Sequence, residues 1–149
     1  MTERNPGDVR GMTFALWSWG PARADAGGIL VSVTDFEVLR ARDLPGVYAE
    51  GLRLRRAWPS ITGAVGMWLW AKPLLRRSGS VSLWRSEADL LRFVRWPRHV
   101  ETMRRYRDAG EITSTSWRAE RFDASEIWAM ATARLSGDDP DLAHQKARS

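Results

Sequence analysis

Residues 80–120, SVSLWRSEADLLRFVRWPRHVETMRRYRDAGEITSTSWRAE, predict a strand, a capped helix, a break, a second helix and another strand. Ser86 is followed three residues later by Asp89, which is the spacing of a capping box. We expect the Ser86 oxygen and the Asp89 carboxylate to accept hydrogen bonds from free amides of the first turn. Pro97 lacks a backbone donor and disfavours helical geometry at Trp96, so a break or kink is predicted there.

The second helix of this stretch presents one histidine to the interior. His99, Met103 and Tyr106 stand at i, i+4 and i+7, which places them on one stripe of the helix. Arg98 and Arg105 fall on the other side, and Gly110 ends the pattern. The spacing therefore predicts that His99 points inward and that the neighbouring arginines do not.

The segments before this stretch complete a ferredoxin-like order. We predict strands at 12–19, 28–38, 62–72, 81–85 and 112–122, a helix from Asp43 to Trp58, and a basic turn at 73–79. The order β-α-β-β-α-β, with an extra N-terminal strand, indicates an α+β fold with an antiparallel sheet and a two-helix layer. Residues 125–135 fit either a helix or an edge strand, and both readings stay open.

Length and composition indicate one domain. The chain has 149 residues, of which 44% are hydrophobic, enough for one core. The polar ends, 1–11 and 136–149, are predicted to be loose and disordered, with a single domain at 12–135. The chain contains no apolar run of about 20 residues, and its start, MTERNPGDVRGM, lacks the apolar core of a signal peptide. We therefore expect a cytoplasmic protein that does not enter the membrane.

The residue types that most often bind transition metals, cysteine and histidine, are scarce. The chain has no cysteine, which excludes disulfides, thiolate metal sites and cysteine nucleophiles. His99 is the one histidine inside the predicted domain, because His144 lies in the tail. These counts predict no zinc or non-heme iron site.

The basic balance of the chain is formed almost entirely by arginine. The formal charge is +5, and Lys72 and Lys146 are the only lysines. Short arginine groups spread over several elements are typical of solvated faces, and no nucleic-acid motif accompanies them. Nucleic-acid binding is therefore a minor alternative.

Two predicted strands look apolar on both sides, which points to a second copy. On the 62–72 strand, one side carries Val65, Met67, Leu69 and Ala71, and the other carries Ala64, Trp68 and Trp70. Two helices cover only one face of a sheet. The other face would leave an exposed apolar patch with a larger area than monomers usually tolerate. We therefore expect a homodimer that packs sheet against sheet.

The stretch 81–105 resembles the antibiotic-biosynthesis-monooxygenase-like group of dimeric α/β-barrel proteins, in its uncharacterised bacterial branch. The resemblance rests on a strand that ends in tryptophan, an acidic helix start, a Phe-Val pair, Pro-x-His and a methionine. These positions are Trp84, Glu87, Phe93, Val94, Pro97, His99 and Met103. The likeness extends over roughly residues 28–122 and is sharp only in this block.

The resemblance implies a ferredoxin-like monomer, a homodimer with facing sheets, and a small-molecule cavity between sheet and helices. It does not imply one reaction, because members include cofactor-free oxygenases, heme-degrading enzymes and proteins without known activity. The Asn-Trp-His set of the heme-degrading members has no counterpart here, since the chain's only asparagine is Asn5. Heme degradation of that type is therefore disfavoured.

His99 is the candidate catalytic residue. An imidazole titrates near pH 6.5 and can take a proton from an acidic phenol or enol, as a cofactor-free oxygenase requires. The structural alternative is a helical histidine bonded to a carbonyl or to Tyr106. The candidate substrate-binding residues are aromatic, apolar or cationic side chains beside it, namely Trp84, Met103, Tyr106, Trp68, Trp117 and Arg118.

The primary hypothesis is a homodimeric monooxygenase-like protein that binds an aromatic or polycyclic small molecule and oxidises it without a cofactor. A ligand-binding or structural dimer without activity is the first alternative. A heme-binding protein with His99 as axial ligand is a weaker one.

Overall fold

The computed structural model describes residues 14–24 and 28–136. The strands are β1 (Phe14–Trp19), β2 (Ile29–Val38), β3 (Ala64–Lys72), β4 (Arg77–Trp84) and β5 (Gly110–Ala119). The helices are α1 (Leu44–Ala57), α2 (Glu87–Val94), α3 (Pro97–Arg105) and α4 (Ala124–Leu135). Short 3₁₀ turns occupy Ala41–Asp43, Trp58–Ser60 and Pro73–Leu75. No helix among these residues is long and apolar enough to cross a bilayer. The predicted loose ends, 1–11 and 136–149, lie outside the described residues except for Ser136.

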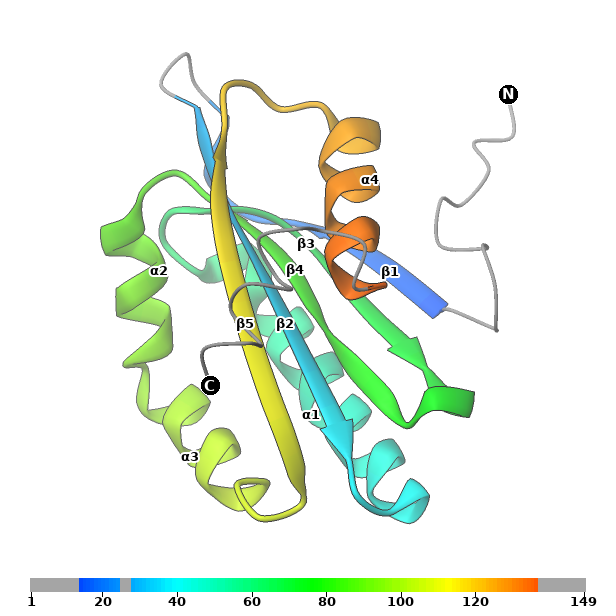
Figure 1. The fold of residues 1–149 in the computed structure, drawn as a ribbon. Coiled ribbons are helices and arrows are strands. Elements are labelled where there is room, and N and C mark those ends of the chain that lie inside the picture. The colour runs from blue at the N-terminus through cyan, green and yellow to red at the C-terminus, as the bar shows by residue number, and fades with distance from the viewer. Residues whose placement is uncertain (1–13, 25–27, 137–149) are drawn as a thin grey trace.

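The five strands form one antiparallel sheet in the order β1-β3-β4-β2-β5 (Figure 1). The helix α1 connects β2 to β3, and α2 with α3 connects β4 to β5. The strand β2 lies between β4 and β5 and pairs with both. This arrangement confirms the predicted ferredoxin-like α+β fold. The extra strand β1 joins the sheet at its edge, next to β3.

The break between α2 and α3 falls where Pro97 predicts it. Trp96 has φ −60° and ψ 128°, which is extended backbone, and Pro97 is the first residue of α3. The cap of α2 is confirmed in part. The Ser86 hydroxyl oxygen accepts from the Asp89 amide at 3.2 Å, but the Asp89 carboxylate accepts from the Ser86 hydroxyl at 2.7 Å rather than from an amide.

The second face of the sheet is covered by the chain itself. Figure 1 shows α1, α2 and α3 on one side of the sheet and α4 on the other. The helix α4 is the segment that the sequence left open, and Asp123 caps it by accepting from the Glu126 amide at 3.2 Å. The premise that only two helices cover the sheet is therefore wrong, whereas the oligomeric state itself stays a prediction.

Four side chains attach α4 to the sheet by burial. Ile127, Trp128, Ala131 and Leu135 pack against the apolar side of β2 and β4 in one core cluster. The Trp128 ring lies 5.0 Å from that of Trp68. Polar contacts add to this packing, because the Arg77 guanidinium donates to the carbonyl of Leu135 at 2.7 Å and forms an ion pair with Asp35. The end of α4 is thereby bound to β2 and β4.

Two residues of β3 are on the opposite sides from those that simple alternation predicts. Ala64 pairs with Trp84 and Gly66 pairs with Leu83, so Val65 is the extra residue of a β-bulge. Val65 is therefore buried on the α4 side, together with Trp68 and Trp70. Ala64 takes its place on the side of α1 and α2. The predicted assignment of these two residues is wrong because a bulge shifts the alternation by one.

The hairpin between β3 and β4 is tighter than the sequence predicts. The strand β4 begins at Arg77, inside the predicted turn, and Arg76 adopts a left-handed conformation with φ 56°. Ser78, Gly79 and Ser80 are weak strand formers, yet all three pair with β2. A Cβ on Gly79 would lie 1.8 Å from the carbonyl oxygen of Thr34, so the close approach of the backbones requires glycine.

Candidate functional site

His99 lies at the junction of α2 and α3, in the first turn of α3. Its Nδ1 is 3.2 Å from the carbonyl oxygen of Val94, and its ring centroid is 4.7 Å from that of Phe93. A carbonyl oxygen only accepts hydrogen bonds, so Nδ1 carries the ring proton. Nε2 is then the basic nitrogen of the neutral ring. The bond to a backbone carbonyl is the one expected of a structural histidine, and the role of His99 as a base stays a prediction.

The surroundings of His99 keep its ring neutral. Burial lowers the pKa of His99 below the ordinary value of 6.5, and the hydrogen bond to Val94 opposes this to a smaller extent. At neutral pH the imidazole is therefore ready to accept a proton at Nε2. This is the protonation state that general-base chemistry requires.

Aromatic rings extend from His99 into the core. Phe93 lies 5.2 Å from Trp84, which in turn lies 5.0 Å from Trp58, centroid to centroid. Trp84 is fully buried and its Nε1 donates to the Ser82 hydroxyl at 2.9 Å. Trp84 is thus a core residue one ring away from His99, and its predicted contact with a ligand stays a prediction.

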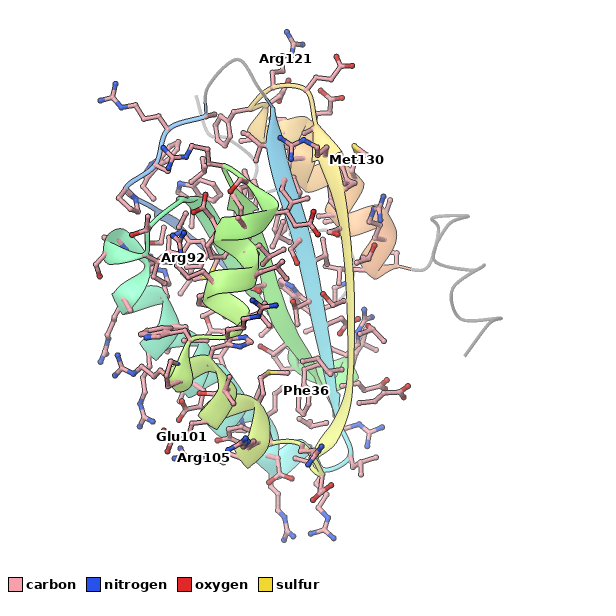
Figure 2. All side chains as sticks on the ribbon, turned by 90° about the vertical axis from the view of Figure 1, so that its left-hand side faces the viewer. Phe36, Arg92, Glu101, Arg105, Arg121 and Met130 are labelled. Carbon is pink, nitrogen blue, oxygen red and sulfur yellow. The ribbon has the colours of Figure 1, made fainter. Side chains whose placement is uncertain are left out.

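The rest of the predicted stripe follows the face of α3 that carries His99. Met103 is 37% exposed, and Tyr106 packs against the buried cluster of Phe36, Val38 and Leu44. Figure 2 shows Phe36 beside α3, close to the strand β2.

Arg105 lies away from the predicted stripe, as the sequence predicts. It donates to Glu50 of α1 at 3.1 Å and pairs with Glu101 at 3.8 Å. Figure 2 shows Arg105 and Glu101 at the outer end of α3. Arg105 therefore ties α3 to α1 at the surface.

Two predicted binding residues lie on the other side of the sheet. Trp68 and Trp117 pack in the cluster beneath α4, with the Arg134 guanidinium 4.2 Å from the Trp117 ring. Arg118 is exposed and stands opposite Leu30 in the register of β5 and β2. Because Leu30 packs in the core cluster beneath α1 and α2, Arg118 lies on that side of the sheet. The structure therefore brings Trp84, Met103, Tyr106 and Arg118 to the side of His99, but not Trp68 or Trp117.

Two hollows flank α2 at the surface. The inner hollow, about 230 Å³, lies between the end of α1 and α2, and the outer hollow, about 570 Å³, follows the α2–α3 junction. The inner hollow is lined by Ala57, Ser60, Ile61, Thr62, Asp89, Arg92, Phe93 and Trp96. The outer hollow is lined by Ala88, Leu91, Arg92, Arg95, Trp96 and Pro97. His99 lines neither of them, although Phe93 contacts both His99 and the inner hollow.

Neither hollow is predicted from the sequence. The i, i+3 spacing of Asp89 and Arg92 does predict that the two side chains lie on one side of α2. The approach of residues 57–62 to α2 is tertiary and had no signal in the sequence.

The two hollows give no support to heme binding through His99. An axial histidine needs a slot for the flat macrocycle beside its free nitrogen, and neither hollow borders His99. Within 14–24 and 28–136, no three His, Asp or Glu side chains group as metal ligands. Heme binding through His99 therefore stays the weaker alternative.

The architecture matches solved structures. An uncharacterised ferredoxin-fold protein from Listeria monocytogenes, related to antibiotic biosynthesis monooxygenases, superposes with a TM-score of 0.54 at 15% identity over 72% of this chain and 63% of that one. SnoaB, a cofactor-independent oxygenase from Streptomyces nogalater, matches with a TM-score of 0.51 at 15% identity over 62% of this chain and 94% of that one. The heme-degrading enzyme LmHde from Listeria monocytogenes matches with a TM-score of 0.50 at 15% identity over 66% and 65%.

Sequence comparison adds no closer relative. No protein-family model and no curated protein sequence matches the chain. The chain spans less than two thirds of the length of both Listeria proteins. At identities of about 15%, the superpositions show the fold alone, and the predicted resemblance is confirmed at the level of the fold. This chain has the ferredoxin-like fold of the antibiotic-biosynthesis-monooxygenase-like proteins.

Proposed function

We propose that this protein binds an aromatic or polycyclic small molecule and oxidises it without a cofactor, with His99 as the base. The observation that carries the proposal is the neutral imidazole, whose Nδ1 is engaged by Val94 and whose Nε2 is basic. The monooxygenase-like fold, shared with a cofactor-independent oxygenase, supports it. Removal of a proton from a phenol or enol would give the electron-rich anion that reacts with dioxygen.

The test is a comparison of His99→Gln with Arg104→Gln. Both residues lie on α3, but Arg104 is exposed. Each protein would be incubated with a panel of polycyclic phenols in an oxygen electrode. A general base contributes roughly 10²–10⁴-fold to rate, so His99→Gln should lose at least about 100-fold of any oxygen uptake and Arg104→Gln should retain it. Equal uptake by wild type and His99→Gln would remove His99 as the base.

A non-catalytic ligand-binding protein is the second candidate function. The observation that favours it is the complete burial of Trp84 together with the absence of His99 from the linings of both hollows. Binding of the same phenols by calorimetry, with no oxygen uptake, would support this function over the first.

A further inference from the structure

We propose that the two hollows beside α2 form one binding site for a small planar aromatic carboxylate, independent of the base at His99. The hollows share Arg92 and Trp96, so a guanidinium and an indole stand between them. Figure 2 shows Arg92 projecting from α2 toward α1, on the side where the inner hollow lies.

The inner hollow has apolar walls for a ring. Phe93 and Trp96 supply aromatic surface, with their centroids 6.2 Å apart and their planes inclined by 39°. Ala57 and Ile61 close the opposite side. Drug-sized ligands occupy pockets of about 300–1,000 Å³, so a hollow of about 230 Å³ suits one or two fused rings.

Asp89 holds Arg92 in position without using up its hydrogen-bonding capacity. Asp89 is 6% exposed, and its Oδ1 accepts from Arg92 Nη1 at 3.2 Å while Oδ2 accepts from Ser86. A guanidinium has five N–H donors. Within the described residues, Arg92 forms a single side-chain hydrogen bond, the one to Asp89. The Arg92 side chain is 64% exposed. Most of the donors therefore remain for a second carboxylate.

The charge around the outer hollow selects an anion. Arg92 and Arg95 line it, and no acidic residue does. The Arg98 guanidinium lies 5.9 Å from the Trp96 ring, which adds a third cation at the shared indole. Arginine pairs with carboxylates by charge-assisted, often bidentate hydrogen bonds. A ligand with its ring in the inner hollow and its carboxylate at Arg92 satisfies both features at once.

The experiment is calorimetric titration of the full chain with 2-naphthoate. Wild type should bind, and 2-naphthamide, which has the same rings without the charge, should bind at least about tenfold more weakly. Arg92→Gln should lose about tenfold or more in naphthoate affinity, because it removes charge-assisted hydrogen bonds to the carboxylate. Trp96→Leu should weaken naphthoate and naphthamide alike, because it removes the ring contact. Arg104→Gln, an exposed arginine outside both hollows, should bind as wild type does.

Arg92 is largely exposed, so Arg92→Gln is expected to fold, and its circular dichroism spectrum would establish this. Equal affinity of wild type for the acid and the amide would overturn the proposal. Unchanged naphthoate affinity in both Arg92→Gln and Trp96→Leu would also overturn it. The same holds if wild type does not bind naphthoate at millimolar concentration.

Discussion

At the residue scale, the carbonyl of Val94 determines which nitrogen of His99 is basic, whereas burial of the ring determines how it responds to acid. Burial holds the folded-state pKa of His99 below its unfolded value of about 6.5. As the pH falls through 6.5, the unfolded chain binds a proton first. The free energy of unfolding therefore contains a contribution that is complete above about pH 6.5 and is lost as the pH falls toward the folded-state pKa.

We expect the melting temperature of wild type to drop more between pH 7.5 and 5.5 than that of His99→Gln, which lacks this titration. Thermal denaturation followed by circular dichroism at both pH values measures the difference. His144 is present in both proteins and serves as the internal control. Parallel pH profiles would mean that the His99 ring titrates alike in the folded and unfolded chain.

A second residue-scale prediction concerns Gly63, which lies against Asp89. Gly63 has φ +80°, and a Cβ there would lie 2.0 Å from Asp89 Cγ. Gly63→Ala should therefore cost about 2 kcal/mol or more in the free energy of unfolding, through backbone strain and displacement of the buried carboxylate. Urea denaturation measures it.

Gly51→Ala is the matched control for this substitution. Its Cβ would meet the flexible end of Leu69 at 2.6 Å, and alanine favours a helix over glycine by roughly 1 kcal/mol. It should cost less than Gly63→Ala. A Gly63→Ala protein as stable as Gly51→Ala would show that Asp89 moves freely.

At the element scale, α4 is attached by a narrow apolar side, and two adjacent residues test that attachment. Ala131 is fully buried, whereas Met130 is 40% exposed, and Figure 2 shows Met130 on α4. Ala131→Asp should cost several kcal/mol, because it buries an unpaired carboxylate. Met130→Asp should change stability by less than about 1 kcal/mol. Urea denaturation followed by circular dichroism measures both free energies of unfolding, and similar midpoints for the two variants would indicate that α4 is loosely attached.

The elements with local signals were predictable from the sequence, and those set by tertiary contacts were not. Pro97 and Ser86 fix a break and a cap by chemistry that acts within one turn, so α2 and α3 were found. The bulge at Val65 depends on how β3 meets β4, and Ser78-Gly79-Ser80 forms a strand only because β2 lies alongside. The segment that became α4 has mixed composition, and its burial beneath the sheet decides its structure.

The candidate site was predictable to a similar extent. Helical spacing placed His99 on the inner side of α3 and Arg105 on the outer side. Strand alternation alone could not show that Trp68 and Trp117 face α4, because the sequence did not tell which side of the sheet α1 and α2 would cover. Arg92 and Trp96 received no role, since their hollows require residues 57–62 to approach α2.

At the scale of the whole molecule, α4 bears directly on the predicted homodimer. A dimer that packs sheet against sheet needs the face that α4 covers, including Ile29, Val31 and Val33. Such a dimer can form only when α4 leaves the sheet. Ala131→Asp should therefore raise the share of dimer or larger species relative to wild type and Met130→Asp, at equal micromolar concentration in light scattering. The same mass for all three proteins would show that this face takes no part in association.

The strand order also has a consequence for how the chain is made. Among the five described strands, only β3 and β4 are neighbours both in sequence and in the sheet, whereas Val38 of β2 pairs with Gly110 of β5. Non-local pairing of this kind slows folding, because loop closure precedes the contacts that compensate for it. During synthesis, β2 emerges long before β5, so one of its hydrogen-bonding edges stays open until the ribosome has passed residue 119. An open edge of this kind is prone to pair with other chains, and chaperone dependence of the nascent protein is expected to concentrate in that interval.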